Sequence, residues 1–349
     1  MDCNCLVDKV VDRIRKLGAR QLSYAGRVVL IKSVLSTLHS YWARIFILPK
    51  TVIRNIEAIC RDYLWHGKEA GSKPALVAWS KICRSKKEGG LGFKDLLLWN
   101  CAALGKYVWW IEKKEDHLWV KWVHAIYIKG KQWKDYAPPV NSSWAWRKVC
   151  QTKDTLKDCI WSQNTSYSIS LGYKWLLPFT ENVGWYAWQL NSWMLPKHGF
   201  ISWIIAHQRL LTQDRLINMN IAQQNRCYLC DLTSEDHEHL FFQCDYSSRC
   251  SSLVSQWCSF TLPDMDCISW WIALRLRTLT QKKVIGVILA SLMYHIWMAR
   301  NKSRIEHVMI RPEMVLAQVQ YDVRARLMNC KINCTNARVV AWMNVLRSN

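Results

Sequence analysis

Acidic residues are scarce in this sequence, and none stand in the paired arrangement that two-metal catalysis requires. The 349 residues include 26 Asp and Glu against 48 Lys and Arg, and no two aspartates are adjacent. Catalysis by two metal ions needs clustered carboxylates to hold both ions. The acids are dispersed along the sequence, and no Ser/His/Asp or Cys/His grouping stands out. We therefore expect the chain not to be an enzyme.

The sequence also lacks a long apolar run. The longest is VIGVILASLMYHIWM at 284–298, which contains His295, whereas about 20 residues are needed to span a bilayer. We expect this run to form a buried helix, with no membrane as partner. The amino-terminal residues MDCNCLVDK are already charged and show no secretion signal. We therefore expect an intracellular protein, in the nucleus or cytoplasm, with reduced cysteines and no disulfide framework.

Positive charge and aromatic side chains are abundant. The net charge is +22, and 22 Trp and 13 Tyr are present. Such a charge favours polyanions such as RNA, DNA or an acidic membrane, and the aromatic residues favour nucleic acid because bases stack on them. A solvated basic surface without a dedicated ligand is the alternative.

Four soft metal ligands lie within the stretch CYLCDLTSEDHEHLFFQC at 227–244. They are Cys227, Cys230, His239 and Cys244, at the spacing C-x2-C-x8-H-x4-C. A Cys-x-x-Cys pair followed by His and Cys can surround one Zn²⁺ tetrahedrally. Because all four positions are filled, the spacing predicts one structural zinc ion and not a catalytic one.

Spacing alone leaves alternatives open at this motif. His237 lies two residues before His239 and competes with it as a ligand; we expect His239 to bind and His237 to be solvated. Cys250 is a spare thiol nearby. A chance pair among 15 cysteines, or a redox pair, would explain Cys227 and Cys230 without zinc.

Several blocks of the sequence, and their order along the chain, resemble one protein family. The blocks are LSYAGRVVLIKSVL at 22–35, WHGKEAGSKPALVAWSKIC at 65–83, KKEGGLGFKDLLLWNCAAL at 86–104, PKHGFISWIIAHQRLLTQDRL at 196–216, the 227–244 motif, and HIWMARN at 295–301. Together they resemble the zinc-binding domain, and the region before it, of plant non-LTR (LINE-type) retrotransposon reverse transcriptases. The resemblance starts after that family's polymerase palm, which implies a fragment that does not polymerise.

A mainly α fold is predicted, with a helical bundle, a small zinc-binding domain and a carboxy-terminal helical segment. Apolar residues recur at helical spacing in 6–17, after Ser23 and after Pro49. We place the domains at 1–135, which the resemblance makes thumb and connector, at 136–264, which holds the zinc motif, and at 265–349. The stretch from residue 167 is predicted to start as a short strand before a helix.

The basic outer faces of the first helices are candidates for nucleic-acid binding. The candidate phosphate contacts are Arg20, Arg27, Lys32 and Arg44. Further along, Trp119, Trp122 and Ile126 share one helical face. Stacking on bases is one interpretation of these tryptophans, and burial in the core is the one we prefer.

Two functions follow as hypotheses. The first is zinc-stabilised binding of RNA or an RNA/DNA hybrid by a retroelement fragment, alone or in trans with a full-length retroelement enzyme. The second is a zinc-stabilised protein-interaction module in which the charge only maintains solubility. Partners that survive nuclease treatment would favour the second.

Overall fold

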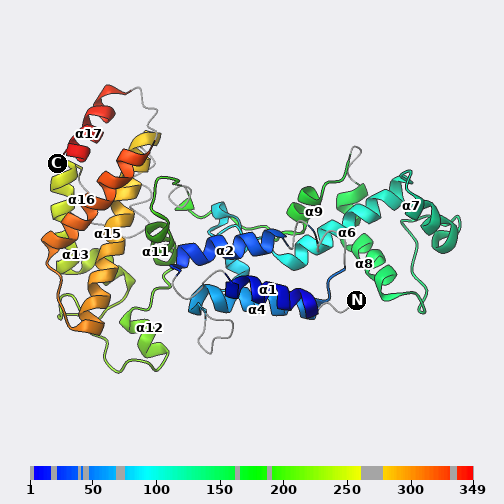
Figure 1. The fold of residues 1–349 in the computed structure, drawn as a ribbon, viewed down its shortest axis with the longest axis horizontal. Coiled ribbons are helices and arrows are strands. Elements are labelled where there is room, and N and C mark those ends of the chain that lie inside the picture. Colours follow the sequence, from blue (N-terminus) through cyan, green and yellow to red (C-terminus); the bar gives the residue numbers. More distant parts are fainter. Residues whose placement is uncertain are drawn as a thin grey trace. The chain divides into compact units, whose positions relative to one another are not determined.

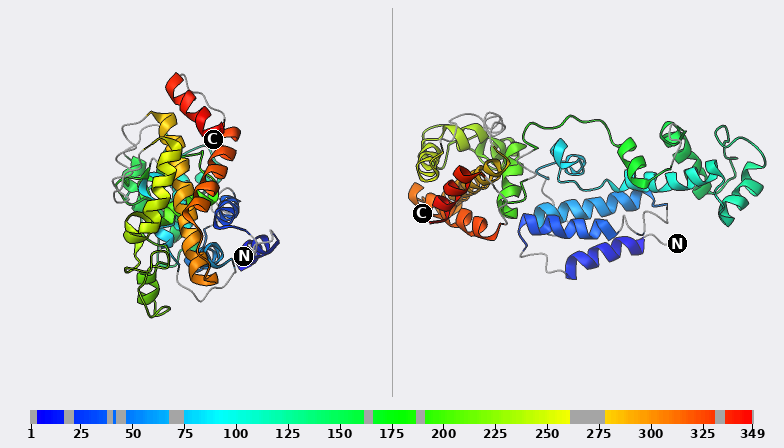
Figure 2. Two further views of the ribbon diagram at one scale, coloured as in Figure 1. Left: turned by 90° about the vertical axis from the view of Figure 1, so that its left-hand side faces the viewer. Right: turned by 90° about the horizontal axis from the view of Figure 1, so that it is seen from above.

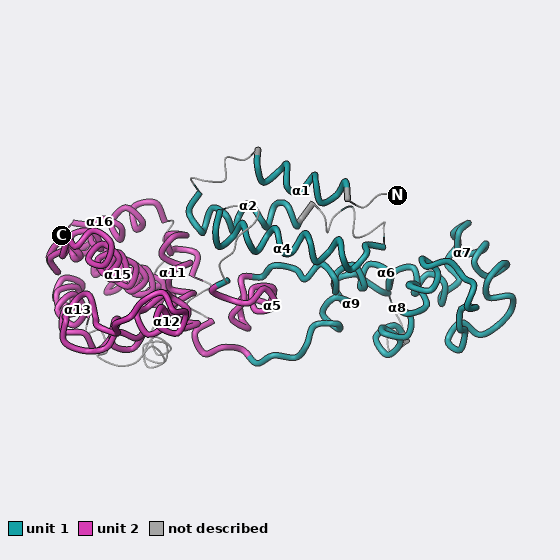
Figure 3. Tube along the Cα trace, turned by 90° about the horizontal axis from the view of Figure 1, so that it is seen from below, with its two compact units in different colours: residues 1–75, 92–181 teal, residues 76–91, 182–349 magenta. Residues whose placement is uncertain are grey.

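The computed structural model describes residues 4–16, 22–37, 41, 47–67, 75–161, 166–186, 191–260, 278–330 and 336–348. Within these ranges every regular element is a helix, which confirms the predicted mainly α fold. The chain divides into two compact units (Figure 3). Unit 1 comprises residues 1–75 and 92–181, and unit 2 comprises residues 76–91 and 182–349. The domain boundaries predicted after residues 135 and 264 stay a prediction.

Unit 1 starts with three helices that pack on one another: α1 (Asn4–Lys16), α2 (Tyr24–Thr37) and α4 (Lys50–His66). The amphipathic pattern predicted for the first helix is confirmed, because its apolar stripe is buried. Ser23 precedes α2, and its Oγ accepts a hydrogen bond from the Gly26 N–H at 3.3 Å. Pro49 precedes α4, which ends at Gly67 with a φ of 68° that favours glycine.

The second half of unit 1 is built on α6 (Leu96–Lys113), which packs against α8 (Trp144–Trp161) and α9 (Ile169–Leu176). The Asp95 side chain caps α6 by accepting from the Leu98 N–H at 2.9 Å. The short strand predicted from residue 167 is wrong. Ser168 Oγ instead accepts from the Leu171 N–H at 3.2 Å and starts α9 as a helix cap.

The preferred prediction of a buried Trp119, Trp122 and Ile126 is also wrong. These residues lie on α7 (Leu118–Val123) and the π-helical turn η4 (His124–Ile128), and they are 38%, 49% and 51% exposed. The inner face of α7 carries Val120 and Val123, which are almost fully buried. Three residues at helical spacing therefore shared a face as predicted, but that face is the outer one.

A buried lysine fixes the loop after this helical turn. Lys153 on α8 is 3% exposed, and its Nζ donates to the carbonyl oxygens of Lys134 at 3.0 Å and Tyr136 at 2.7 Å. The loop places Tyr136 beside Trp146, whose indole N–H donates to the tyrosine hydroxyl at 3.2 Å. The loop is thus stabilised both by hydrogen bonds from the Lys153 ammonium group and by aromatic packing.

Unit 2 is organised around α15 (Leu279–Glu306), which is buried on nearly all sides between residues 284 and 293. In Figures 1 and 2 it runs beside α16 (Pro312–Asn329). The other elements of this unit are α5 (Trp79–Ile82), η3 (Lys86–Glu88), α11 (Pro196–Ala206), α12 (Gln213–Asn218), η5 (His239–Gln243), α13 (Asp245–Cys258) and α17 (Ala337–Ser348).

Helix α15 is, among the described residues, the one helix long and apolar enough to cross a membrane. Its apolar window is 72% buried within the protein. A core helix passes the same test of length and hydropathy, and the predicted buried helix at 284–298 is confirmed.

Candidate metal centre

The first two cysteines of the motif lie on a tight turn. The Asp231 N–H donates to the Cys227 carbonyl at 2.9 Å, and Asp231 has the left-handed φ of 57° that aspartate tolerates. The Cys227 N–H donates to the Thr233 carbonyl at 2.9 Å. The Leu229 N–H points at the Cys227 sulfur, 3.5 Å away. Backbone geometry therefore brings both thiols to one side of the turn.

A widened helical turn brings the other two ligands together. In η5 the Cys244 N–H donates to the His239 carbonyl at 2.8 Å, five residues back. In an α-helix, residues five apart point about 140° away from each other, since each residue turns about 100°. The π-helical turn removes most of this divergence. Asp236 caps the turn by accepting from the His239 N–H at 2.7 Å.

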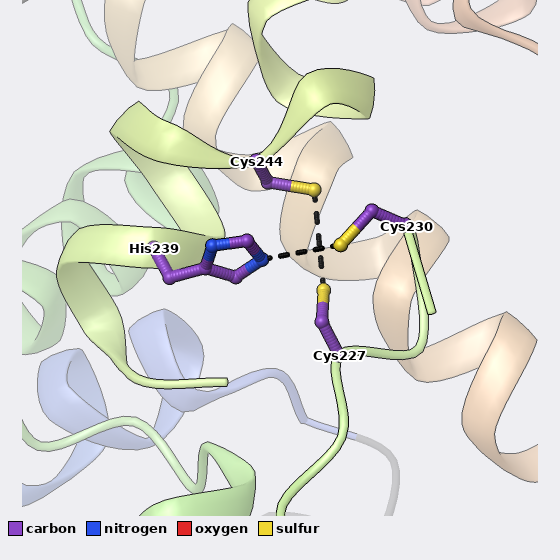
Figure 4. Close-up of side chains that lie close together, drawn as sticks. All are labelled: Cys227, Cys230, His239 and Cys244. Carbon is purple, nitrogen blue, oxygen red and sulfur yellow. Dashed lines mark hydrogen bonds between the residues drawn. The ribbon is translucent and has the colours of Figure 1, made fainter. Parts of the chain in front are cut away.

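Figure 4 shows that all four side chains point toward one another, with their ligand atoms within 4.8 Å. The Cys227 and Cys244 sulfurs are 3.9 Å apart, and the Cys230 sulfur is 3.3 Å from His239 Nε2. A tetrahedral zinc ion would hold two sulfurs about 3.8 Å apart and a sulfur and a nitrogen about 3.5 Å apart. The donor set and its separations therefore fit zinc.

Protonation also suits a metal ligand at Cys244. The hydrogen bond between the two sulfurs lowers the pKa of Cys244 and raises that of Cys227, so the pair shares one proton more readily than either thiol alone would lose its own. Cys244 directly precedes α13, where the helix N-terminus favours a thiolate. Burial raises the pKa of the spare thiol Cys250 to about 12, so this side chain stays protonated.

The two neighbouring histidines have different surroundings. The Thr233 hydroxyl lies 3.1 Å from His239 Nδ1 and 3.2 Å from His239 Nε2. The prediction that His237 is solvated is wrong, because it is 8% exposed. Its Nε2 accepts a hydrogen bond from the Leu210 N–H at 3.0 Å. His237 is therefore the partner of a backbone N–H that lies 27 residues earlier in the chain. Burial lowers the pKa of His237 to about 4.

A buried ion pair anchors the motif to α15. Arg300 donates to both Glu235 carboxylate oxygens, with Nε 2.9 Å from Oε1 and 3.1 Å from Oε2. Both side chains are almost fully buried, and Glu235 also accepts from the Gln213 N–H at 2.9 Å. Ser303, one turn later on α15, donates to the Tyr228 carbonyl at 2.8 Å. The sequence prediction missed this pair, although Arg300 lies within the HIWMARN block.

Two of the four candidate phosphate contacts, Arg27 and Lys32, interact with other residues of the protein. Arg27 is half-buried, donates to the Leu64 carbonyl at 3.3 Å and lies over the Tyr24 ring. Lys32 is half-buried, with Nζ 5.6 Å from the centre of the Phe93 ring. Both cations thus make contacts within unit 1. Arg20 and Arg44 lie outside the described residues, and phosphate binding by any of the four stays a prediction.

Comparison with known proteins supports the zinc interpretation. Residues 167–250 match the family described as zinc-binding in reverse transcriptase, and this range includes all four ligands. A protein of Arabidopsis thaliana named for ribonuclease H is 30% identical over 148 residues, which are 41% of this chain and 24% of that protein. An uncharacterized mitochondrial protein of the same organism is 29% identical over 112 residues, 32% of this chain and 73% of the relative. The chain thus spans about a quarter of the first relative.

Proposed function

We propose that this chain binds RNA or an RNA/DNA hybrid as part of a LINE-type reverse transcriptase of a plant retrotransposon, and that one structural zinc ion stabilises its second unit. Cys227, Cys230, His239 and Cys244 would hold the ion. With four protein ligands it would supply a cross-link and no open coordination position. A full-length retroelement enzyme is the proposed protein partner, and nucleus or cytoplasm the proposed location. The chain itself needs no polymerase chemistry for this role.

The observation that carries nucleic-acid binding is an exposed aromatic surface in unit 1. A hollow of about 390 Å³, here called the aromatic hollow, is lined in part by Tyr107, Trp119, Trp122, Tyr127 and Trp146. Two of these rings, Trp119 and Trp122, are substantially exposed. Bases of any sequence can stack on such rings. The base-stacking interpretation of these tryptophans is therefore the one that the structure favours.

Positive charge surrounds this part of the chain. The exposed cations between residues 113 and 147 are Lys113, Lys114, Lys121, Lys129, Lys131, Lys134 and Arg147. Lys121 lies 2.6 Å from the exposed Asp116, a pair that bulk solvent screens. Cations beside exposed rings are the combination that binds single-stranded nucleic acid, with lysines on the phosphates and rings on the bases.

Titration of a labelled single-stranded RNA tests the proposal. Replacing both Trp119 and Trp122 with alanine should weaken binding roughly 5- to 150-fold for each stacked base lost, which corresponds to about 1–3 kcal/mol. Trp175→Ala is the matched control, because Trp175 is 51% exposed on α9 of the same unit and does not line the hollow. Binding should also fall steeply with added salt.

Two results would contradict the proposal. One is no RNA binding at low salt by the folded, zinc-loaded chain. The other is an equal loss of affinity in Trp175→Ala and in the double variant, which would mean that the aromatic hollow is not the RNA-binding surface. Protein partners that survive nuclease treatment would then favour the alternative function as an interaction module.

A further inference from the structure

A second group of metal-ligand side chains lies in unit 2, on three helices that do not carry Cys227, Cys230, His239 and Cys244, here called the Cys3His cluster. It comprises His198 on α11, His295 on α15 and Asp322 on α16, with their donor atoms within 4.8 Å of one another. Asp322 Oδ2 is 2.7 Å from His295 Nε2 and 3.4 Å from His198 Nε2. Neighbouring ligands of a four-coordinate ion are about 3.3 Å apart when metal–nitrogen distances are about 2.0 Å.

His198 is the unusual member of this group. It is fully buried, and neither of its ring nitrogens has a hydrogen-bond partner. Buried polar atoms nearly always have a hydrogen-bond partner, because burying one without a partner is unfavourable. His198 Nε2 lies 3.4 Å from Asp322 Oδ2 without the geometry of a hydrogen bond.

Asp322 supplies the negative charge. Burial acts to raise its pKa, but the hydrogen bond with His295 holds that pKa below the ordinary value. The Ser291 hydroxyl also donates to Oδ2, at 3.4 Å. A carboxylate is therefore present at a site that is about nine-tenths buried, held by contacts that orient it toward both imidazoles.

One member of the group borders a cavity. His295 is one of the residues that line a hollow of about 700 Å³, together with Tyr294, Lys197, Lys302 and Arg311. An ion could enter by this route, and an ion bound by three side chains would keep further coordination positions. Two imidazoles and one carboxylate are the donor set of zinc and iron sites that retain exchangeable positions.

We propose that His198, His295 and Asp322 form a second metal site, distinct from the Cys3His cluster, that binds a divalent transition-metal ion such as Zn²⁺ with a coordination position left open. This site would differ from the Cys3His site in having no sulfur ligand and no closed shell. Its loss and the loss of the Cys3His site are separable, because the two share no residue.

Metal content after loading with Zn²⁺ and removal of excess ion tests the site. The wild-type chain should retain two equivalents, and His198→Ala and Asp322→Asn one each. Cys230→Ser should lose only the other ion. His307→Asn is the control, because His307 is exposed at the end of α15 with a φ of 56° that asparagine tolerates. This variant should keep both ions.

Cobalt substitution distinguishes the two sites without any variant, and so guards against variants that do not fold. One equivalent of Co²⁺ should show absorption from thiolate-to-cobalt charge transfer, and the second should add visible bands without it. A wild-type chain that binds a single equivalent would overturn the proposal, as would retention of both ions in His198→Ala and in Asp322→Asn.

Discussion

Each of the two units of this protein is stabilised by a different kind of interaction. In unit 1 the helices α6, α8 and α9 bury a continuous cluster of apolar and aromatic side chains. In unit 2 the segment 219–236, between α12 and the turn that leads into η5, contains no helix and contributes few buried apolar residues. Polar contacts hold it, namely those among Cys227, Cys230, His239 and Cys244, and the Glu235–Arg300 pair. A segment with little apolar packing thus depends on a few point contacts, so single substitutions should act most strongly there.

The largest expected effect is the loss of zinc. Cys230→Ser, or chelation of the metal, should loosen residues 200–250 and leave the first helices of unit 1 folded. Zinc contributes about 10–16 kcal/mol of apparent binding free energy in small finger peptides, where binding and folding are coupled. Hydrogen exchange of both units, with and without chelator, measures this difference.

Cys330→Ser is the matched control for this prediction. Cys330 is a half-buried thiol of the same unit and lies outside the cluster. Its replacement should change neither the metal content nor the exchange rates. Simultaneous loss of protection in both units of Cys230→Ser would contradict the idea that these polar contacts act on unit 2 alone.

A smaller effect is expected at the buried ion pair. Arg300→Met removes the cation but leaves the Glu235 carboxylate buried, which should lower the free energy of unfolding of unit 2 by about 3–5 kcal/mol. Arg304→Met, one turn further on α15 at a half-buried position, should change it by about 0.5 kcal/mol or less. Urea titration of each variant provides both values.

A second change separates charge burial from lost packing. Adding Glu235→Gln to Arg300→Met removes the uncompensated charge and keeps a side-chain oxygen for the Gln213 N–H. The double variant should recover part of the lost stability. If it is less stable than Arg300→Met alone, the cost lies in packing and not in the buried charge.

Local spacing explains which parts of this structure could be predicted from the sequence. The four proposed ligands lie within eighteen residues, so a turn and one widened helical turn suffice to bring them together. The apolar stripe of α1 likewise depends on neighbours three or four residues away. Both of these local predictions agree with the structure, whereas the short strand predicted from residue 167 does not, because Ser168 starts a helix there.

Predictions that needed the partner of a side chain failed. Solvation of His237 seemed to follow from its place beside another histidine, but its partner is the Leu210 N–H, 27 residues away. The Glu235–Arg300 pair spans 65 residues and had no local signal. For Trp119 and Trp122 the helical period was right, but periodicity does not say which face is turned inward.

The smallest predicted effect concerns unit 1 and tests whether its packing is tight. A Cβ added at Gly172 on α9 would lie within contact distance of the Tyr167 hydroxyl, which itself donates to the Ala102 carbonyl at 2.6 Å. Gly172→Ala should therefore destabilise unit 1 by about 1–3 kcal/mol. Gly199→Ala on α11 is the comparison in unit 2, where the nearest atoms lie 3.8 Å from the added carbon. There the added carbon meets no close contact, so the gain in helix propensity should stabilise unit 2 by about 0.5–1 kcal/mol.

Removing the tyrosine hydroxyl shows whether this contact is the cause. Tyr167→Phe alone should cost about 1 kcal/mol, because it gives up one hydrogen bond to Ala102. Combined with Gly172→Ala it should cost less than the sum of the two single changes, since the space of the hydroxyl becomes available to the new methyl group. Thermal unfolding of the four proteins gives the coupling. Strict additivity would mean that Gly172→Ala acts through the backbone, and that unit 1 is packed less tightly around Tyr167 than its aromatic core indicates.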